Sequence, residues 1–198
     1  MTSPVDPALD VINEFVWAMQ AAFNPDDAEM PPLIRQVQGM QIGGGSKTVR
    51  VFAGSEGLPP SLVINAGGGE CAGPLLWVRI AQRYLSRRAN FPAPFVGPTN
   101  CRAEDVEPAL QVEVGVGRCS TMEAEPAWDV LDAEGEVSLD DSWRIGLAMD
   151  IAGEKLTKVR PQGPVALAFS PDTVAPFGPD GGIVIWTGMA YVQYERGC

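Results

Sequence analysis

Residues Leu110–Cys119 read LQVEVGVGRC, and large apolar side chains alternate in this stretch with polar or glycine positions. Successive side chains of a β-strand point to opposite faces of the sheet, so Leu110, Val112, Val114 and Val116 would share one face. That face is expected to pack in a core, because every position on it is apolar. The stretch therefore predicts a central strand of a sheet.

The sequence on both sides of this stretch predicts further strands, separated by glycine and proline. Leu75–Leu85 alternates in the same way. The remaining strands are expected at Val37–Ile42, Thr48–Phe52, Leu62–Asn65, Val165–Phe169 and Ile183–Tyr194. Gly43–Lys47 would form the tip of a hairpin between the first two of these, and the run from Pro176 to Gly182 would form a tight connection before the last.

A first helix is expected from Pro7 to Phe23. Asp6 can cap this helix, and proline suits the first helical position, where its missing N–H leaves no hydrogen bond unmade. The helix would bury an apolar stripe with three- and four-residue spacing, formed by Leu9, Ile12, Val16, Met19 and Phe23 and widened by Val11, Phe15 and Ala22.

A second helix is expected to start near Leu139, with Ser138 as its cap, and to end between Ala152 and Lys158. The resulting order of helix, strands, helix and strands favours an α+β fold. The predicted architecture is a mostly antiparallel mixed sheet flanked by two main helices, with long loops.

A chain of 198 residues is expected to form one domain, residues 1–198. In this division residues 1–28 hold the N-terminal helix, residues 29–73 form an additional hairpin or arm, and residues 74–198 form the sheet with the second helix. The 22 glycines and 18 prolines predict long connections between these elements.

The charge and composition exclude several classes of function. The chain carries 14 Lys and Arg against 25 Asp and Glu, a net charge of −11, so its surface as a whole would repel phosphate backbones. The absence of histidine excludes Ser-His-Asp and Cys-His catalysis as well as histidine metal ligation. No apolar run reaches the roughly 18 residues of a membrane span. The first ten residues, MTSPVDPALD, lack the basic start and apolar stretch of a secretory signal, so a cytoplasmic origin is expected.

The four cysteines are Cys71, Cys101, Cys119 and Cys198, and none of them forms a Cys-x-x-Cys motif. A thiol pair is predicted among Cys71, Cys101 and Cys119, because consecutive strands of a meander bring strand starts and ends together. Two of these three are expected to have Cα atoms within the roughly 4.4–6.8 Å that a disulfide permits. Which two of them pair stays open, and the thiols start out reduced in a cytoplasm.

No catalytic, cofactor-binding or metal-binding residue is predicted. The carboxylates are scattered as on an acidic surface, and without histidine a zinc site would need all four thiolates. The five tryptophans could stack a ligand, although those in the expected helices and strands suit packing better. A small enzyme or ligand-binding domain that uses carboxylates and aromatic side chains is therefore kept as the alternative from another functional class.

The connection after the Leu75–Leu85 strand is expected to touch another subunit. It carries Arg87, Arg88, Phe91 and Phe95 in a proline-rich run, too apolar for an idle loop on a monomer. Loops carry interactions while a scaffold positions them, so these four side chains are the candidates for subunit contact.

Several motifs between residues 71 and 194 form a pattern when they are taken together. They are Cys71–Arg79 (CAGPLLWVR), Tyr84, Ser86, Phe91–Pro94 (FPAP), Cys101, Leu110–Cys119, Gly178–Gly182 (GPDGG) and Trp186. The pattern resembles small structural proteins from the head-to-tail connection of bacteriophages, the siphophages that infect actinobacteria. In the order of its elements the chain is similar to tail terminators.

The resemblance implies a virion structural protein of the neck and no enzyme. Such a subunit would form a ring, a homohexamer in this family, that caps the tail tube and joins it to the head. The implied partners are further copies of the chain, the tail-tube protein and a head-to-tail stopper or adaptor, while DNA passes through the channel without specific binding. The protein would be assembled in the host cytoplasm and reside in the virion. Residues 29–73 are longer than a minimal terminator needs, so another neck protein (stopper or adaptor) or a tail-tube or minor tail protein is the alternative within this class.

Overall fold

Five strands form a single sheet in the order β1-β2-β3-β5-β4 in the computed structural model, which describes residues 6–23, 43–46, 48–54, 73–99, 105–161 and 163–195. The strands are β1 Val49–Ala53, β2 Leu75–Arg87, β3 Val106–Cys119, β4 Ala168–Asp180 and β5 Ile183–Gln193. β1 runs parallel to β2, and all other neighbours are antiparallel. The sheet is therefore mixed and mostly antiparallel, as predicted.

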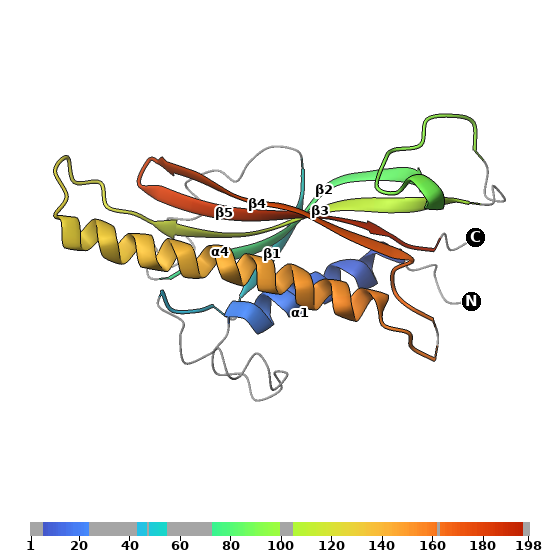
Figure 1. The fold of residues 1–198 in the computed structure, drawn as a ribbon, viewed down its shortest axis with the longest axis horizontal. Helices are drawn as coiled ribbons and strands as arrows, with labels where there is room; N and C mark the ends of the chain where they lie inside the picture. The colour runs from blue at the N-terminus through green and yellow to red at the C-terminus, as the bar shows by residue number, and fades with distance from the viewer. Residues whose placement is uncertain are drawn as a thin grey trace.

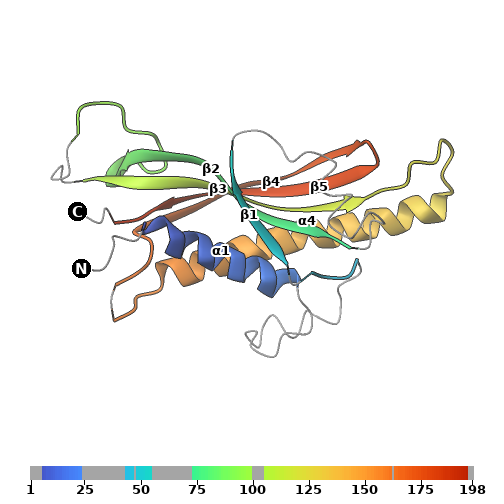
Figure 2. The same cartoon turned by 180° about the vertical axis from the view of Figure 1, so that it is seen from behind.

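Two helices, α1 (Ala8–Phe23) and α4 (Trp128–Thr157), lie together on one face of this sheet (Figures 1 and 2). A short 3-10 turn, Arg88–Asn90, follows β2. The prediction of an α+β fold with two main helices beside the sheet is confirmed. The Val37–Ile42 and Leu62–Asn65 strands lie outside the described residues, as does most of the 29–73 arm.

The core lies between the sheet and the two helices. Leu110, Val112, Val114 and Val116 of β3 are all buried in it, so the alternation of this strand identified the correct face. The opposite side of the core comes from both helices, with Phe15, Met19, Ile145, Ala148 and Ala152 among the buried side chains. Burial of apolar area at about 25 cal/mol per Å² makes this layer the main source of stability.

The start of α1 is as predicted, and most of its predicted apolar stripe is buried. The backbone N–H of Ala8 donates to Oδ1 of Asp6 at 3.0 Å, which confirms the cap. Leu9 is 52% exposed, whereas Val11 and Ala18 are fully buried. Val11, Ile12, Phe15, Met19, Ala22 and Phe23 of the predicted stripe are buried, whereas Leu9 is exposed and Val16 is only partly buried.

α4 is longer than predicted, because it begins at Trp128 and not near Leu139. Residues 128–133 are all exposed, so the first turns carry no periodicity that points to a core. Ser138 does not cap the helix; its hydroxyl accepts a hydrogen bond from Nε1 of Trp186 at 2.7 Å. The predicted end is confirmed, since the helix stops at Thr157.

β4 is also longer than predicted, because it replaces the expected strand at 165–169 and continues through the expected connection to Asp180. Only Gly181 and Gly182 form the turn to β5, with φ of 56° and 76°, a conformation that glycine adopts without strain. Prolines at 171, 176 and 179 are tolerated because β4 is an edge strand and needs donors on one side only. A prediction that treats these prolines as the end of the strand therefore gives the wrong bounds for β4.

Candidate functional site

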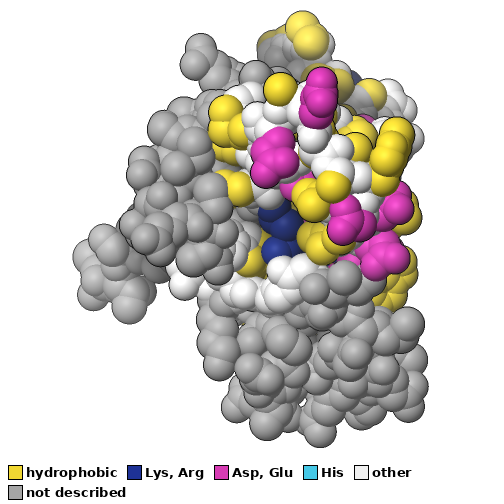
Figure 3. Space-filling view, turned by 90° about the vertical axis from the view of Figure 1, so that its left-hand side faces the viewer, with side chains coloured by type: hydrophobic (Ala, Val, Ile, Leu, Met, Phe, Trp, Pro, Cys, Tyr) yellow, Lys and Arg dark blue, Asp and Glu magenta, His cyan; other side chains and the backbone are white. Residues whose placement is uncertain are grey.

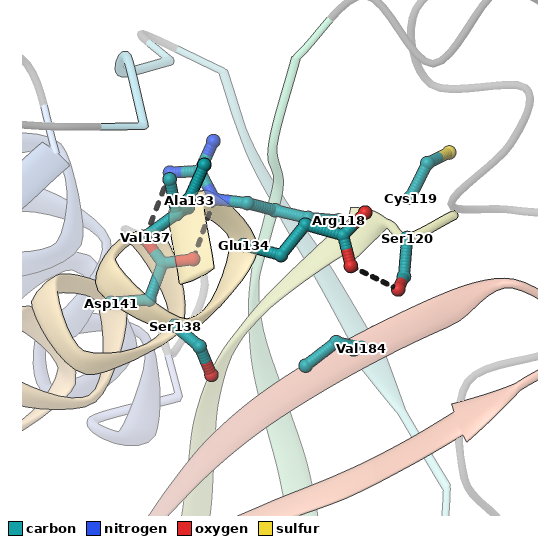
Figure 4. A pocket seen from close by; sticks show the side chains of 9 residues that line it. All are labelled: Arg118, Cys119, Ser120, Ala133, Glu134, Val137, Ser138, Asp141 and Val184. Atoms are coloured by element: carbon teal, nitrogen blue, oxygen red, sulfur yellow. Dashed lines mark hydrogen bonds and ion pairs between the residues drawn. The ribbon is translucent and has the colours of Figure 1, made fainter. Parts of the chain in front are cut away.

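The end of β3 and the first half of α4 are joined by a partly buried ion pair. Nε of Arg118 donates to Oδ2 of Asp141 at 2.5 Å, and Nη2 donates to Oδ1 at 2.8 Å (Figure 4). The same guanidinium donates to the backbone carbonyls of Gly43 and Gly44. Burial raises the pKa of the Asp141 carboxyl, against the opposing effect of Arg118. Arg118 thus ties three separate segments together.

Glu134 makes a second polar contact between the same two elements. The hydroxyl of Ser120 donates to Oε2 of Glu134 at 2.7 Å, and the backbone N–H of Thr121 donates to Oε1 at 2.6 Å. Both carboxylate oxygens of Glu134 therefore have donors from the chain that follows β3. The contact holds the first half of α4 against the sheet.

A cavity of about 230 Å³ lies between these two polar contacts. Its walls include Cys119, Val137 and Val184, which come from β3, α4 and β5 (Figure 4). The carboxylates and the guanidinium beside the cavity already form hydrogen bonds within the chain. The surface that remains inside the cavity is therefore mainly apolar. The cavity can accept an apolar group. The polar side chains beside it hold β3 and α4 together and are not arranged for acid–base chemistry.

Cys119 lies on the rim of this cavity and is disulfide-bonded. The other three cysteines lie outside the described residues. The predicted thiol pair among Cys71, Cys101 and Cys119 therefore stays a prediction as to its partners.

A trough of about 560 Å³ lies between the proline-rich connection and β4. Tyr84, Gln111 and Tyr191 contribute to its walls, with Asp172 on β4. The hydroxyl of Tyr84 donates to the carbonyl of Pro92 at 2.9 Å, and that of Tyr191 donates to Oδ2 of Asp172 at 3.4 Å. Burial raises the pKa of Tyr84 to about 12 and also raises the pKa of Tyr191, so both phenols are neutral at physiological pH. The trough could hold a neutral polar ligand through hydroxyl and amide groups.

The four predicted contact residues lie together at the far end of β2. The Arg87 guanidinium lies 4.8 Å from the ring centroid of Phe95, and Arg88 pairs with Glu107 at 3.0 Å. The connection folds back on its own strand, since the N–H of Phe95 donates to the carbonyl of Leu85 at 2.6 Å. Phe91 is half-buried, while Arg87 and Arg88 are exposed. Contact of these residues with another subunit stays a prediction.

The first half of α4 carries an exposed apolar surface that the sequence reasoning missed. Trp128 is 80% exposed and Leu139 is 69% exposed, while Trp143 and Leu131 are exposed to 46% and 37%. At 100° per residue these four side chains fall on one face of the helix, and we call them the α4 stripe. Their spacings of three, eight and four residues would have indicated this shared face if the helix had been predicted from residue 128.

No protein-family model matches the chain, and no curated protein matches it. Neither of the two helices α1 and α4 is long and apolar enough to cross a membrane. Within the described ranges, no group of three or more Cys, Asp or Glu side chains is arranged to hold a metal ion.

Proposed function

We propose that the chain is a virion structural protein whose copies form a ring that caps the tail tube of a siphophage and joins it to the head. The observation that carries this proposal is the α4 stripe, a line of large apolar side chains left exposed on a helix of 30 residues. Large apolar side chains exposed on one helix face mark sites of protein association, and covering them with a partner stabilises the assembly. The resemblance to tail terminators supplies the kind of assembly.

The acidity of the chain suits this role. A ring with a net charge of −11 on every subunit would present a negative channel to DNA, and negative walls repel phosphates and prevent sticking. One heterologous interface, repeated around an axis, closes into such a ring. The tail-tube protein and a head-to-tail stopper or adaptor would then meet the two faces of the ring.

The proposal is tested by the mass and shape of the purified protein. Light scattering coupled to size-exclusion chromatography should give six times the chain mass of 21.1 kDa, and negative-stain electron microscopy should show rings. A protein that stays monomeric at high concentration would contradict the proposal. Images with isolated tail tubes would separate the alternatives within the class: a terminator binds at tube ends, a stopper or adaptor binds the head side, and a tail-tube protein polymerises.

The trough favours a second candidate function, a ligand-binding domain that uses aromatic and carboxylate groups. Its support is the pair of neutral phenols, Tyr84 and Tyr191, beside Asp172. Titration with neutral polar fragments, followed by NMR of backbone amides, should shift residues around the trough in this case. Loss of the shifts in the Tyr191→Phe variant would identify the trough as the binding site. Tyr194→Phe, which removes a phenol hydroxyl three residues further along the chain, is the control and should keep the shifts.

A further inference from the structure

A row of polar side chains crosses four strands on the floor of the trough. Gln82 of β2 lies opposite Gln111 of β3, and Gln111 lies opposite Tyr191 of β5, which in turn lies opposite Ser170 of β4. Direct partners point to the same face of a sheet, and the neighbouring Val112 points into the core. These four residues, the polar row, therefore lie on the face opposite α1 and α4 (Figures 1 and 2).

Two β-bulges bring side chains to this row. Ile80 packs against the core, and regular alternation would turn Gln82, two residues later, toward the helices as well. The bulge between them places Gln82 in the polar row instead. A second bulge, between Pro171 and Val174 of β4, contains Asp172 of the trough. Bulges often lie beside functional sites, where they re-aim side chains in this way.

The side chains at the centre of the trough are only loosely bonded to one another. Nε2 of Gln111 donates to the hydroxyl of Tyr191 at 3.5 Å, and this hydroxyl donates to Oδ2 of Asp172 at 3.4 Å. Both contacts are long beside the roughly 2.7–3.0 Å of ordinary hydrogen bonds, so a ligand hydroxyl can replace or share them. Thr173 fixes the carboxylate from the other side, because its N–H and its hydroxyl donate to Oδ1 at 2.8 and 3.0 Å.

The proline-rich wall of the trough is held firmly by contrast. The hydroxyl of Tyr84 donates to the carbonyl of Pro92 at 2.9 Å, and the hydroxyl of Ser86 donates to the carbonyl of Ala93 at 2.8 Å. A wall that is already ordered costs little conformational entropy when a ligand binds. The trough therefore combines a fixed wall with polar groups that are available for a ligand.

The chemistry of these groups selects a neutral ligand rich in hydroxyl groups. None of the described residues that line the trough is Lys or Arg, and Asp172 would repel an anion. A cation would meet one carboxylate that already accepts three hydrogen bonds. Hydroxyl and amide groups both donate and accept, as the hydroxyls of a sugar do. Proline and tyrosine rings offer apolar surface to the C–H groups of a sugar ring.

We infer that the trough is a carbohydrate site that binds a short neutral oligosaccharide along the polar row. The inference rests on the second candidate function, a ligand-binding domain, and names the chemical class of its ligand. Asp172 accepts hydrogen bonds from ring hydroxyls, and the amides of Gln82 and Gln111 bind hydroxyls beside them. The volume of about 560 Å³ falls within the roughly 300–1,000 Å³ of small-molecule sites.

The trough and the α4 stripe lie in different parts of the molecule. The trough belongs to the half of the sheet in which β2 ends and β4 begins (Figure 1). Figure 3 shows the opposite end, where α4 begins and where acidic and hydrophobic side chains alternate on the surface. Substitutions in the trough therefore leave the surface that carries the ring proposal unchanged.

Saturation-transfer NMR tests the carbohydrate assignment, because it observes the sugar and works for a monomer and for a ring alike. The probes are a panel of neutral di- and trisaccharides with gluco, galacto, manno and N-acetylated rings. Glucose 6-phosphate and ethanolamine are the anionic and cationic controls. At least one neutral saccharide should receive saturation from the full chain, and the two charged probes should not.

Variants then locate the bound saccharide. Asp172→Asn should weaken its affinity about tenfold, because hydrogen bonds to an ionised carboxylate are roughly twice as strong as neutral ones. Asp150→Asn is the matched control, since it makes the same change at an exposed residue of α4 and should have no effect. Gln82→Ala, also at an exposed residue, should weaken affinity about fivefold. Calorimetric titration measures the affinities, and circular dichroism establishes folding.

The outcomes separate this inference from the candidate function beneath it. If no neutral saccharide binds while neutral polar fragments still shift the amides around the trough, the carbohydrate assignment is overturned and the ligand-binding domain stands. If neither binds, both are overturned. Saccharide binding that is unchanged in both Asp172→Asn and Gln82→Ala would also overturn the assignment, as would binding of either charged probe in preference to every saccharide.

Discussion

The indole of Trp77 on β2 occupies the space that a side chain on Gly115 of β3 would need. The two residues are direct partners across the strands, and a Cβ atom on Gly115 would lie 2.2 Å from Cζ2 of Trp77. In this position Nε1 of Trp77 donates to Oε1 of Glu113 at 3.0 Å, while Arg79 binds the other carboxylate oxygen. The glycine therefore allows a buried aromatic and a buried ion pair to share one face of the sheet.

Gly115→Ala is expected to lower the free energy of unfolding by about 1–3 kcal/mol, because the added methyl forces the indole or the strand to move. Urea denaturation followed by circular dichroism measures the change. Gly135→Ala is the control: nothing lies within 4 Å of a Cβ there, and alanine in a helix interior should stabilise the protein by roughly 0.5–1 kcal/mol. Equal effects of the two substitutions would contradict this account.

Asp6→Ala should destabilise the protein by about 1 kcal/mol, because it removes the oxygen that caps α1. Asp6→Asn should have a much smaller effect, since asparagine also caps helices and the exposed pair between Asp6 and Arg83 contributes little. Thermal or urea unfolding of both variants checks this order. A loss in the Asn variant close to that in the Ala variant would mean that the ion pair outweighs the cap.

Stability should fall in acid partly through Glu14. Burial alone would raise the pKa of this carboxyl, but hydrogen bonds from Arg160 and Lys155 outweigh burial and bring the pKa below its ordinary 4.5. A lowered pKa in the folded state stabilises the protein above the ordinary pKa, and the contribution disappears as the pH falls through the folded value.

Glu14→Gln should therefore lower the free energy of unfolding at pH 7, by about 1 kcal/mol. The difference between the parent chain and the variant should shrink below a pH of about 4.5. Urea unfolding at several pH values measures it. A difference that is the same at pH 7 and in acid would show that charge on Glu14 is not responsible.

Glu134→Ala should loosen the first half of α4, since it removes the acceptor for Ser120 and Thr121. Hydrogen exchange of the amides in residues 128–134 should become faster, while amides in the buried second half of the helix keep their protection. Glu136→Ala is the control, as this side chain is exposed on the same helix. Equal exchange in both variants would contradict a role for Glu134 in holding the helix.

The disulfide of Cys119 should join it to Cys71 or Cys101. Digestion without reductant, after alkylation of free thiols, should release a cross-linked peptide that contains Cys119 and one of these two residues. The register favours Cys71, since Leu75 at the start of β2 lies opposite Gly117, two residues before Cys119. A cross-link to Cys198 would show the prediction to be wrong.

The candidate surfaces were partly accessible from the sequence. The chemistry of Arg87 and Phe95 in a proline-rich run was visible before folding, and the structure brings the two side chains together. The α4 stripe was not predicted, because apolar side chains that face the core occur only in the second half of this helix. Exposed turns such as those around Trp128 give no such signal, and only their spacing marks them.

The sequence alone determined which face of each central strand is buried. The alternation through Val112 and Val114 has the period of a strand. The hydrophobic effect buries the apolar face regardless of which elements pack on it. The cap at Asp6 was likewise a local matter, decided by a side chain two residues from the N–H that it binds. The charge balance and the lack of histidine follow from composition and need no structure.

The tertiary structure decided how distant segments meet. Nothing local in the sequence pairs Arg118 with Asp141, since the contact depends on where α4 begins and on how it lies across the sheet. The length of β4 was decided in the same way: its prolines would end a central strand, but at the sheet edge only one side needs hydrogen-bond donors. Periodicity and caps act within a few residues, whereas burial, ion pairing and edge position depend on packing between parts of the chain that are far apart in sequence.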